Sequence, residues 1–351
     1  MRAVVYEGPE DIRLEEVPEP VLTDPEDAIV RVTTTSICGS DLHIVHGLLP
    51  KMEPGRIVGH EFTGVVSQVG SAVTRFKRGD RVLGPAAVWC GRCHACKKGL
   101  VSACERGATF GHGPLLGDLQ GAQADYVRVP FSDFTLQPVT APDEQIIFAG
   151  DILPTGYSAV VGLTPGGRGV RTGDNVVVFG LGPVGLCAVA SARLFGPAKI
   201  IAVDNQTQRL TTARDLGADV TVDAAIEDVR EVIREFTDGW GADYVVEAVG
   251  KEETLRNAVS VAAAGGVVSV VGAFQQPTIL NAPRMMAKNL TLAMGMGDLG
   301  RMRELVGVIE AGNLDLTPLV THRMSLDDAI RAYEIFDKRL ESAIKILLTT
   351  S

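Results

Sequence analysis

The pattern of apolar and polar positions changes character near residue 155. Before that point, short runs rich in valine and isoleucine are broken by glycine, proline and aspartate, as in residues 28–32, 64–70 and 80–83. Such runs are typical of β-strands bounded by turns. After that point, apolar runs of strand length alternate with longer segments of helical length. Strands and helices in alternation predict a parallel sheet with right-handed crossovers.

This alternation defines the expected elements of the second half. They are strand 175–179 with helix 183–195, strand 199–203 with helix 208–216, strand 219–223 with helix 226–236, strand 244–248 with helix 252–264, and strand 267–271. Helices are also expected over 299–311 and 326–336, the second N-capped by Ser325, and a last strand over 343–348 should rejoin the first domain. The predicted fold class is α/β: residues 1–154 and 288–351 form a β-rich domain, and residues 155–287 form a doubly wound parallel-sheet domain.

The composition of the chain excludes some classes of protein. The chain has 351 residues, of which 46% are hydrophobic, and a formal charge of −10. It can therefore fill two packed domains, and its acidic balance argues against a nucleic-acid partner. Residues 175–192 form an uncharged run long enough to suggest a membrane helix, but three glycines and Pro183 interrupt it. The N-terminal segment has no apolar core of the signal-peptide type. We expect a cytoplasmic protein without a membrane partner.

A glycine-rich turn joins strand 175–179 to the next helix. It reads Gly180-Leu181-Gly182-Pro183-Val184-Gly185, and its glycines permit a tight turn, a close approach of a pyrophosphate and close helix-to-strand packing. Asp204 ends the next strand, where a carboxylate accepts hydrogen bonds from ribose hydroxyls and repels a 2′-phosphate. The turn predicts an NAD site; a glycine turn without a nucleotide is the alternative. The expected cofactor-binding residues are Thr155, Gly180, Gly182, Pro183, Val184, Gly185, Asp204, Arg209 and Val271, with a surface helix position as the alternative for Arg209.

Four cysteines fall within fifteen residues in the pattern C-x2-C-x2-C-x7-C. They are Cys90, Cys93, Cys96 and Cys104. Four thiolates complete the tetrahedral shell of Zn²⁺ and leave no position for water or substrate, which is typical of a structural zinc site. An iron–sulfur ligand set and a redox-active C-x-x-C are the competing interpretations. Thiolates kept for a metal indicate a reducing compartment.

A second group of metal-ligand residues is incomplete. Cys38 opens the run Cys38-Gly39-Ser40-Asp41-Leu42-His43, and His60 lies in Gly59-His60-Glu61. Both are good zinc ligands, and a catalytic zinc site needs a third protein ligand and one open position. The candidates for that third ligand are Glu61, His94, His112 and Asp151, and residue chemistry alone leaves the choice among them open.

These motifs occur in the order found in zinc-dependent medium-chain alcohol dehydrogenases, a family that the chain resembles over essentially its whole length. The motifs are Cys38 to His43, Gly59-His60-Glu61, the four-cysteine loop, Thr155-Gly156-Tyr157 and the glycine turn. The resemblance implies a GroES-like catalytic domain carrying both zinc sites and a Rossmann domain that binds NAD. It also implies that the third ligand lies four residues before Thr155, at Asp151, so that two zinc ions bind per chain. The closest motifs are those of the glutathione-independent formaldehyde dehydrogenases and secondary-alcohol dehydrogenases.

The resemblance also implies a mechanism. The substrate oxygen binds the catalytic zinc, which promotes reversible hydride transfer between an alcohol and NAD. Ser40 and His43 would carry the proton away, although a turn residue and a surface histidine are the plain alternatives. Glu61 lies behind the metal and would replace the bound water during turnover. Four apolar residues are candidates to line the substrate pocket, which favours a small or medium apolar alcohol, primary or secondary: Leu49, Trp89, Phe110 and Met294.

Other functions remain open at this level. A formaldehyde, other aldehyde or polyol dehydrogenase would have the same fold, and so would a zinc-free quinone or enone reductase, which would not need the cysteines. A protein of another class would bind the nucleotide without turnover, as a sensor or a structural subunit. The apolar stretch 290–294 is a candidate edge strand that would pair with a second subunit. We therefore expect a homodimer or homotetramer whose partner molecules are small alcohols, aldehydes or ketones.

Overall fold

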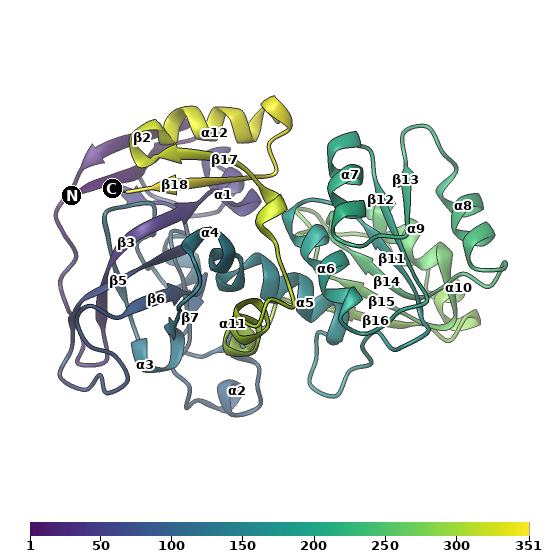
Figure 1. Ribbon diagram of the computed structural model, residues 1–351, viewed down its shortest axis with the longest axis horizontal. Coiled ribbons are helices and arrows are strands. Elements are labelled where there is room, and N and C mark those ends of the chain that lie inside the picture. Colours follow the sequence, from purple (N-terminus) through teal and green to yellow (C-terminus); the bar gives the residue numbers. More distant parts are fainter. Residues whose placement is uncertain (351) are drawn as a thin grey trace. The chain divides into compact units, whose positions relative to one another are not determined.

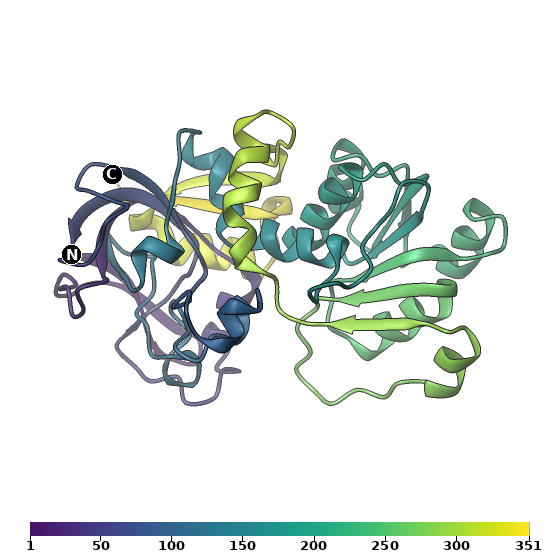
Figure 2. The same cartoon turned by 90° about the horizontal axis from the view of Figure 1, so that it is seen from below.

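The computed structural model describes residues 1–350, which divide into two compact units. The first unit comprises Met1–Asp151 together with the chain from Leu299 onward, and the second comprises Ile152–Asp298. The sequence analysis places these boundaries at 154/155 and 287/288 instead. In Figures 1 and 2, the yellow C-terminal strands lie beside the purple N-terminal strands of the same unit.

The first unit is built mainly from antiparallel strands. Its largest sheet has the order β10-β6-β5-β3-β18-β17, with β9 paired to β3, and a smaller sheet has the order β2-β1-β4. The strands are β1 (Arg2–Gly8), β2 (Asp11–Glu16), β3 (Ala28–Ser36), β4 (Arg56–Ile57), β5 (Phe62–Val69), β6 (Arg81–Gly84), β7 (Ala87–Val88), β8 (Ala108–Thr109), β9 (Tyr126–Val129), β10 (Gln137–Pro138), β17 (Val320–Ser325) and β18 (Lys345–Thr349).

Short helices connect these strands. The α-helices are α1 (Gly39–Val45), α2 (His94–Lys97), α3 (Ser132–Thr135), α4 (Asp143–Ile146), α11 (Met302–Glu310) and α12 (Ala329–Asp337). The 3-10 turns are η1 (Val101–Ala103), η2 (Pro114–Leu116), η3 (Ile147–Gly150), η4 (Leu299–Arg301), η5 (Thr317–Leu319), η6 (Leu326–Asp328) and η7 (Leu340–Ser342). Ser325 caps the turn that leads into α12, as the sequence predicts, by accepting a hydrogen bond from the Asp327 amide.

The expected return of the C-terminal strand to the first domain is confirmed. β18 pairs antiparallel with β3, so that Leu347 lies opposite Ser36. β3 pairs on its other side with β5, where Thr35 lies opposite Phe62. β3 is therefore held between a strand that begins at Phe62 and a strand from the end of the chain.

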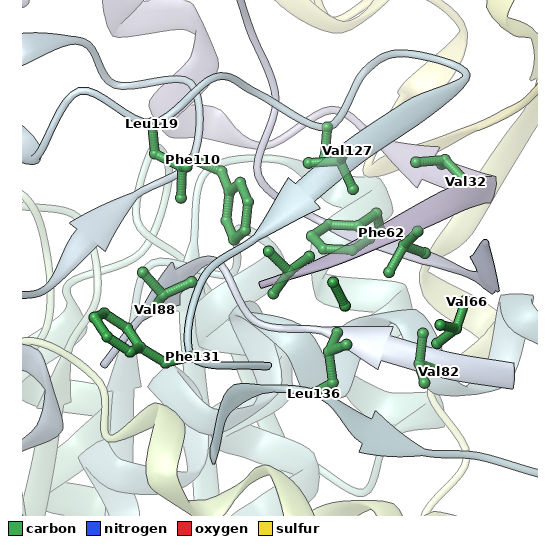
Figure 3. Close-up of a cluster of buried hydrophobic side chains, with 14 of the residues drawn as sticks. Val32, Phe62, Val66, Val82, Val88, Phe110, Leu119, Val127, Phe131 and Leu136 are labelled. Carbon is green, nitrogen blue, oxygen red and sulfur yellow. The ribbon is translucent and has the colours of Figure 1, made fainter. Parts of the chain in front are cut away.

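A cluster of buried side chains fills the space beside β3, β5 and β9 (Figure 3). Phe62 and Phe110 meet edge to face with their ring centroids 5.3 Å apart, and both are fully buried. This geometry suits the quadrupoles of the two rings. Phe110 therefore belongs to the hydrophobic core, and the sequence-based suggestion that it lines the substrate pocket is wrong.

The second unit contains a six-stranded parallel sheet in the order β13-β12-β11-β14-β15-β16. The order reverses between β11 and β14, which is the doubly wound pattern of dinucleotide-binding domains. Its strands are β11 (Asn175–Phe179), β12 (Lys199–Asp204), β13 (Val220–Asp223), β14 (Ala242–Glu247), β15 (Ala262–Val270) and β16 (Thr291–Met294). Its helices are α5 (Ile152–Val161), α6 (Pro183–Arg193), α7 (Thr207–Asp215), α8 (Val229–Phe236), α9 (Glu252–Val261) and α10 (Ala282–Ala287).

Two segments of this unit differ from the sequence expectation. α9 ends at Val261, because Ala262 has an extended backbone and begins β15. The strand is irregular there: its register shifts between Ala242 and Tyr244 on β14, and Gly265 has a positive φ of 74°. In addition, Thr291–Met294 pairs with β15 as the edge strand of this sheet, although the sequence boundary assigns it to the first domain.

The uncharged run 175–192 divides between β11 and α6, joined by the glycine turn. Among the described residues 1–350, no helix is long and apolar enough to cross a membrane.

Replacing Phe110 by alanine should test the core assignment. The substitution removes a fully buried ring, and we expect the free energy of unfolding to fall by about 3–5 kcal/mol. Denaturant unfolding followed by tryptophan fluorescence measures the change. Leu115→Ala is the matched control from the same loop, because Leu115 is 52% exposed. A loss for Phe110→Ala no larger than that of the control would contradict the assignment.

Candidate active site and metal centres

The sheet of the first unit brings the two halves of the incomplete metal group together. Cys38 follows β3 by two residues and is the N-cap of α1, while His60 and Glu61 immediately precede β5. Because β3 and β5 are paired at these ends, Cys38 and His60 reach the same place. Asp151 joins them directly after the turn η3, whose Gly150 carbonyl oxygen accepts a hydrogen bond from the Ala86 amide, between β6 and β7.

Four potential metal ligands converge at this point. One donor atom each from Cys38, His60, Glu61 and Asp151 lies within 4.8 Å of the other three. The Asp151 Oδ2 atom is 3.3 Å from His60 Nε2 and 3.5 Å from Cys38 Sγ. Of the sequence candidates for the third ligand, Asp151 and Glu61 are in the group, and His94 and His112 are outside it.

The charges of the site favour a bound cation. Burial raises the pKa of the Cys38 thiol, and the neighbouring carboxylates of Asp151 and Glu61 raise it further. Burial raises the pKa of Asp151, but the hydrogen bond and charge of His60 outweigh this and lower it to about 2. For His60, burial lowers the pKa, whereas Asp41 and Asp151 raise it well above its ordinary value. Zn²⁺ would displace the thiol and imidazole protons on binding, since its ligands coordinate in their deprotonated forms. The donor set therefore fits zinc.

Asp41 orients His60 for this role. Its Oδ1 atom lies 3.1 Å from His60 Nδ1, and its Oδ2 atom accepts a hydrogen bond of 2.9 Å from the Cys38 amide. Burial raises the pKa of Asp41, but His60 lowers it more, so the carboxylate is ionised and can only accept. Nδ1 therefore carries a proton, and once zinc displaces the proton on Nε2, the lone pair of that nitrogen faces Cys38 and Asp151. A carboxylate in this place fixes the tautomer and ring orientation of a ligating histidine.

Glu61 is held by an ion pair with Lys345. The Lys345 ammonium and the Ser36 hydroxyl both donate to Glu61 Oε2, while Oε1 is buried without a hydrogen-bond partner. Burial by itself lowers the pKa of Lys345, and Glu61 raises it above its ordinary value. Both side chains are at most 1% exposed. Glu61 therefore presents one unsatisfied oxygen in the group that contains Cys38, His60 and Asp151.

The four-cysteine loop forms a second, separate group in the same unit. All four cysteines are free thiols, and their sulfur atoms are 3.5 Å (Cys93 to Cys96), 3.9 Å (Cys93 to Cys104) and 3.6 Å (Cys104 to Cys90) apart. Four sulfurs at roughly 2.3 Å from one tetrahedral zinc lie about 3.8 Å apart. These spacings match a closed metal site and are far too long for disulfides.

The other predicted residues of the first unit lie near the open group. Ser40 Oγ is 3.3 Å from His60 Nε2, and His43 follows one helical turn later on α1. Burial lowers the pKa of His43, and His46 lowers it further. His112 Nδ1 donates a hydrogen bond of 2.8 Å to the Phe110 carbonyl oxygen, and the His112 ring packs against His60 with ring centroids 5.0 Å apart. Because that carbonyl oxygen can only accept, His112 Nδ1 is the donor.

The glycine turn of the second unit has the shape that a pyrophosphate needs. Gly180 has a φ of 86°, and a side chain on Gly185 would overlap the Gly180 carbonyl oxygen. At Gly182 an added Cβ would meet only Arg209 Nη1, at 4.0 Å, so the space above this glycine is open. Gly182 is also the N-cap of α6, with Pro183 as the first helical residue and Val184 and Gly185 in the first turn. The residues fit a dinucleotide cofactor.

Asp204 stands beside this turn. Its Oδ2 atom accepts a hydrogen bond of 2.7 Å from the Leu181 amide and lies 3.8 Å from Arg209 Nη1. The structure thus brings together Asp204, Arg209 and the glycine turn. Val271 follows β15 directly, and its amide donates a hydrogen bond to the Glu247 carbonyl oxygen. Thr155 lies on α5, close to Gly297.

Sequence reasoning missed Asp41, Lys345 and Ser36. A signal existed for Lys345, because it is the one charged residue in the apolar run 343–348, and a buried lysine needs a partner. Asp41 lies in the Cys38 to His43 run, three residues after a predicted ligand, and this spacing was a signal that it could contact the metal group. Nothing in the sequence indicates that Ser36 faces Glu61, since that contact depends on the pairing of β3 with β5.

Comparison with known proteins gives a consistent result. The model of the alcohol dehydrogenase GroES-like domain matches residues 24–139, and that of the zinc-binding dehydrogenase matches residues 183–311. An alcohol dehydrogenase of Cupriavidus necator is 36% identical over 366 residues, which cover 99% of this chain and 98% of that protein. The solved structure of alcohol dehydrogenase TADH from Thermus sp. ATN1 covers both chains completely, with a TM-score of 0.94 and 40% identity. A dehydrogenase from Sinorhizobium meliloti 1021, solved bound to NADP, has a TM-score of 0.84 and 28% identity and covers 99% of each chain.

These matches confirm the predicted fold class, a GroES-like domain combined with a Rossmann domain. They support zinc and a nicotinamide cofactor, whereas the resemblance to the formaldehyde and secondary-alcohol branches stays a prediction. Sequence, fold and donor groups agree, and the chain belongs to the family of zinc-type, medium-chain alcohol dehydrogenases.

Proposed function

We propose that the protein is an NAD-dependent alcohol dehydrogenase that catalyses reversible hydride transfer between NAD and a small or medium apolar alcohol, primary or secondary. The observation that carries this proposal is the convergence of Cys38, His60 and Asp151 beside a separate, closed set of four cysteines. Three protein ligands leave a position for substrate, whereas four thiolates leave none. The first group would hold the catalytic zinc, and the second group a structural zinc.

The ligand charges support this division. The Cys38 thiolate and the Asp151 carboxylate balance the two charges of the metal, and His60 coordinates as the neutral tautomer that Asp41 selects. When bound there, zinc acts as a Lewis acid that polarises an alcohol or carbonyl oxygen and lowers the pKa of a hydroxyl group. NAD supplies the hydride acceptor.

Ser40 and His43 provide a route for the proton. Ser40 lies beside the ligand atoms, 3.3 Å from His60 Nε2, so its hydroxyl is placed to accept a proton from an alcohol in the site. His43 lies on the same face of α1, three residues further. Its lowered pKa keeps the imidazole neutral near pH 7, which suits a proton acceptor. Ser40 would pass the proton on and His43 would receive it, and the ribose of a bound cofactor would supply the hydroxyl groups between them.

Glu61 has a different role in this proposal. Its unpartnered Oε1 atom can approach the metal position while Oε2 stays with Lys345. Such a move would displace water as substrate and product exchange. Lys345 keeps the carboxylate charged and limits its range.

The fold alone does not decide between NAD and NADP, because a relative with this fold was solved bound to NADP. The proposed preference for NAD therefore depends on the side chain of Asp204. The Asp204 side chain is only 7% exposed and is fixed by the Leu181 amide beside the glycine turn. A 2′-phosphate would meet this carboxylate. Arg209 lies near Asp204 and partly offsets its charge.

Zinc analysis combined with an alcohol panel tests the proposal. We expect two zinc ions per purified chain and formation of NADH, followed by absorbance, with apolar alcohols in preference to polyols. Two zinc ions without turnover of any alcohol or aldehyde would instead favour a nucleotide-binding sensor. Efficient turnover of polyols alone would contradict the proposed substrate class.

The role of Asp151 predicts a specific loss of metal. Asp151→Asn keeps the size of the side chain and removes its charge, so the chain should retain only the four-cysteine zinc and lose at least about 100-fold in activity. Zinc content and kcat/KM measure the effect. Asp143→Asn is the matched control, since Asp143 accepts hydrogen bonds from Thr33 and Thr34 and is not in the metal group. Full activity of Asp151→Asn would place the third ligand elsewhere.

The role of Asp204 predicts a change in cofactor selectivity. Asp204→Asn keeps an acceptor for the Leu181 amide but removes the charge that repels a 2′-phosphate. The ratio of kcat/KM for NAD to that for NADP should fall about 10- to 100-fold, the equivalent of roughly 1.4–2.7 kcal/mol. Asp223→Asn is the control, because Asp223 lies opposite Asp204 at the end of the neighbouring strand. An unchanged ratio would assign the ribose contact to another residue.

The edge strand β16 supports the expectation of a homodimer or homotetramer. Met294 on this strand is 48% exposed, and an edge strand offers unpaired backbone groups to a second strand. We expect Met294→Lys to reduce the molar mass measured by light scattering during gel filtration. Ile226→Lys, at an apolar position that is 82% exposed elsewhere in the same unit, should leave the mass unchanged. A monomeric wild type would refute this part of the proposal.

A further inference from the structure

A buried chain of polar side chains runs from His60 to the C-terminal helix α12. His60 contacts Asp41, and Asp41 Oδ2 lies 3.5 Å from the amide nitrogen Nε2 of Gln123. The hydroxyl of Tyr333, on α12, donates a hydrogen bond of 2.9 Å to Gln123 Oε1. Asp41 and Gln123 are fully buried, and Tyr333 is 4% exposed. All four residues belong to the first unit.

The orientation of the Gln123 amide follows from its partners. The Ser36 carbonyl oxygen, 3.1 Å from Gln123 Nε2, can only accept a hydrogen bond. The nitrogen of the amide must therefore face Ser36 and Asp41, which leaves Oε1 toward the Tyr333 hydroxyl. The hydrogen bonds converge on Asp41 from both sides: Tyr333 donates to Gln123, Gln123 donates to Asp41, and His60 donates to Asp41.

The backbone holds Gln123 in this place. Its amide donates to the Val58 carbonyl oxygen, and its own carbonyl oxygen accepts from the Val4 amide. The side chain passes directly over Gly59, where any Cβ would overlap it. Gly59 precedes His60, so the absence of a side chain at this position lets Gln123 reach Asp41.

Loss of one member would leave a neighbour unsatisfied. A buried donor or acceptor without a partner is unfavourable, and the penalty is relieved when the neighbour rotates or admits water. Loss of Gln123 would affect Asp41 most directly, because the Asp41 Oδ2 atom accepts hydrogen bonds from both the Cys38 amide and Gln123. Rotation of Asp41 would also release its Oδ1 atom from the imidazole of His60.

We propose that Gln123 and Tyr333 are positioning residues for the catalytic metal, acting through Asp41 on His60. They hold the Asp41 carboxylate in the plane in which Oδ1 receives Nδ1–H, so that His60 Nε2 stays directed at Cys38 and Asp151. This inference rests on the proposed function only in assuming that zinc binds at these three residues. Through Tyr333, helix α12 would thus influence the geometry of the metal site, although it contributes no ligand.

Release of zinc to a coloured chelator tests the inference without reference to turnover. The zinc-loaded full chain is mixed with excess 4-(2-pyridylazo)resorcinol, and the release phase that Asp151→Asn lacks is assigned to the catalytic zinc. Tyr333→Phe and Gln123→Met should each speed this phase about tenfold. The phase from the four-cysteine site should not change, which provides a control inside the same molecule.

Further variants separate positioning from packing. Gln123→Glu has nearly the size of glutamine but sets an anionic acceptor against Asp41 and the Ser36 carbonyl oxygen, so it should release zinc faster than Gln123→Met. Packing alone predicts the reverse order. Tyr244→Phe, which removes a buried tyrosine hydroxyl from the second unit, should release zinc at the wild-type rate. In Co²⁺-substituted protein, the visible bands of the catalytic site should shift in Tyr333→Phe and stay unchanged in Tyr244→Phe.

Wild-type release rates in both Tyr333→Phe and Gln123→Met would overturn the inference. Thermal unfolding of each variant checks that the fold is retained, and Tyr333→Phe decides the matter if a Gln123 variant does not fold. A wild type that binds two zinc ions but oxidises no alcohol would refute the proposed function and leave this test intact. Slow, uniform release in every variant would refute the inference and leave the dehydrogenase activity untouched.

Discussion

The pairing of β3 with β5 on one side and with β18 on the other is the constraint on which the site depends. It delivers Cys38 from the end of β3, His60 and Glu61 from the start of β5, and Lys345 from β18 to one place. Since strand register moves every side chain between the two faces of a sheet, a slip of one residue in either pairing would separate these groups. The positions of the metal ligands therefore depend more on strand register than on the conformation of the loops that carry them.

Buried charge explains why so many groups surround a few ligands. Four groups that are anionic when zinc is bound, namely Cys38, Asp41, Glu61 and Asp151, share the space with the single ammonium of Lys345. Charges removed from water are tolerated only when they are paired or bound to a metal. A dication restores most of the balance, and Lys345 compensates Glu61. The four-cysteine group is less dependent on buried charges, because three of its members are only partly buried and Cys104 Sγ accepts hydrogen bonds from the Cys90 and Arg106 amides.

Much of this arrangement was predictable from local sequence. The glycine turn, the alternating strands and helices and the four-cysteine loop each lie within a short segment, so their spacing reports their structure directly. The choice of Asp151 over His112 did not follow from spacing; it came from the family resemblance. Contacts between segments that lie far apart in the sequence could not be predicted. Gln123, Tyr333 and Lys345 are polar residues in apolar surroundings, but only the folded sheet shows which group each one faces. Phe110 illustrates the opposite error, since an aromatic residue near the metal motifs is part of the core.

The ion pair between Glu61 and Lys345 joins residues 284 positions apart. A nascent chain still attached to the ribosome can bring Cys38 and His60 together long before Lys345 has been made. Until β18 docks, Glu61 has no buried cation beside it, and the region around the catalytic ligands is open at one edge of β3. Cys38 and His60 thus precede Lys345 by more than 280 residues, so the metal centre gains its compensating cation only after β18 has been made and has docked.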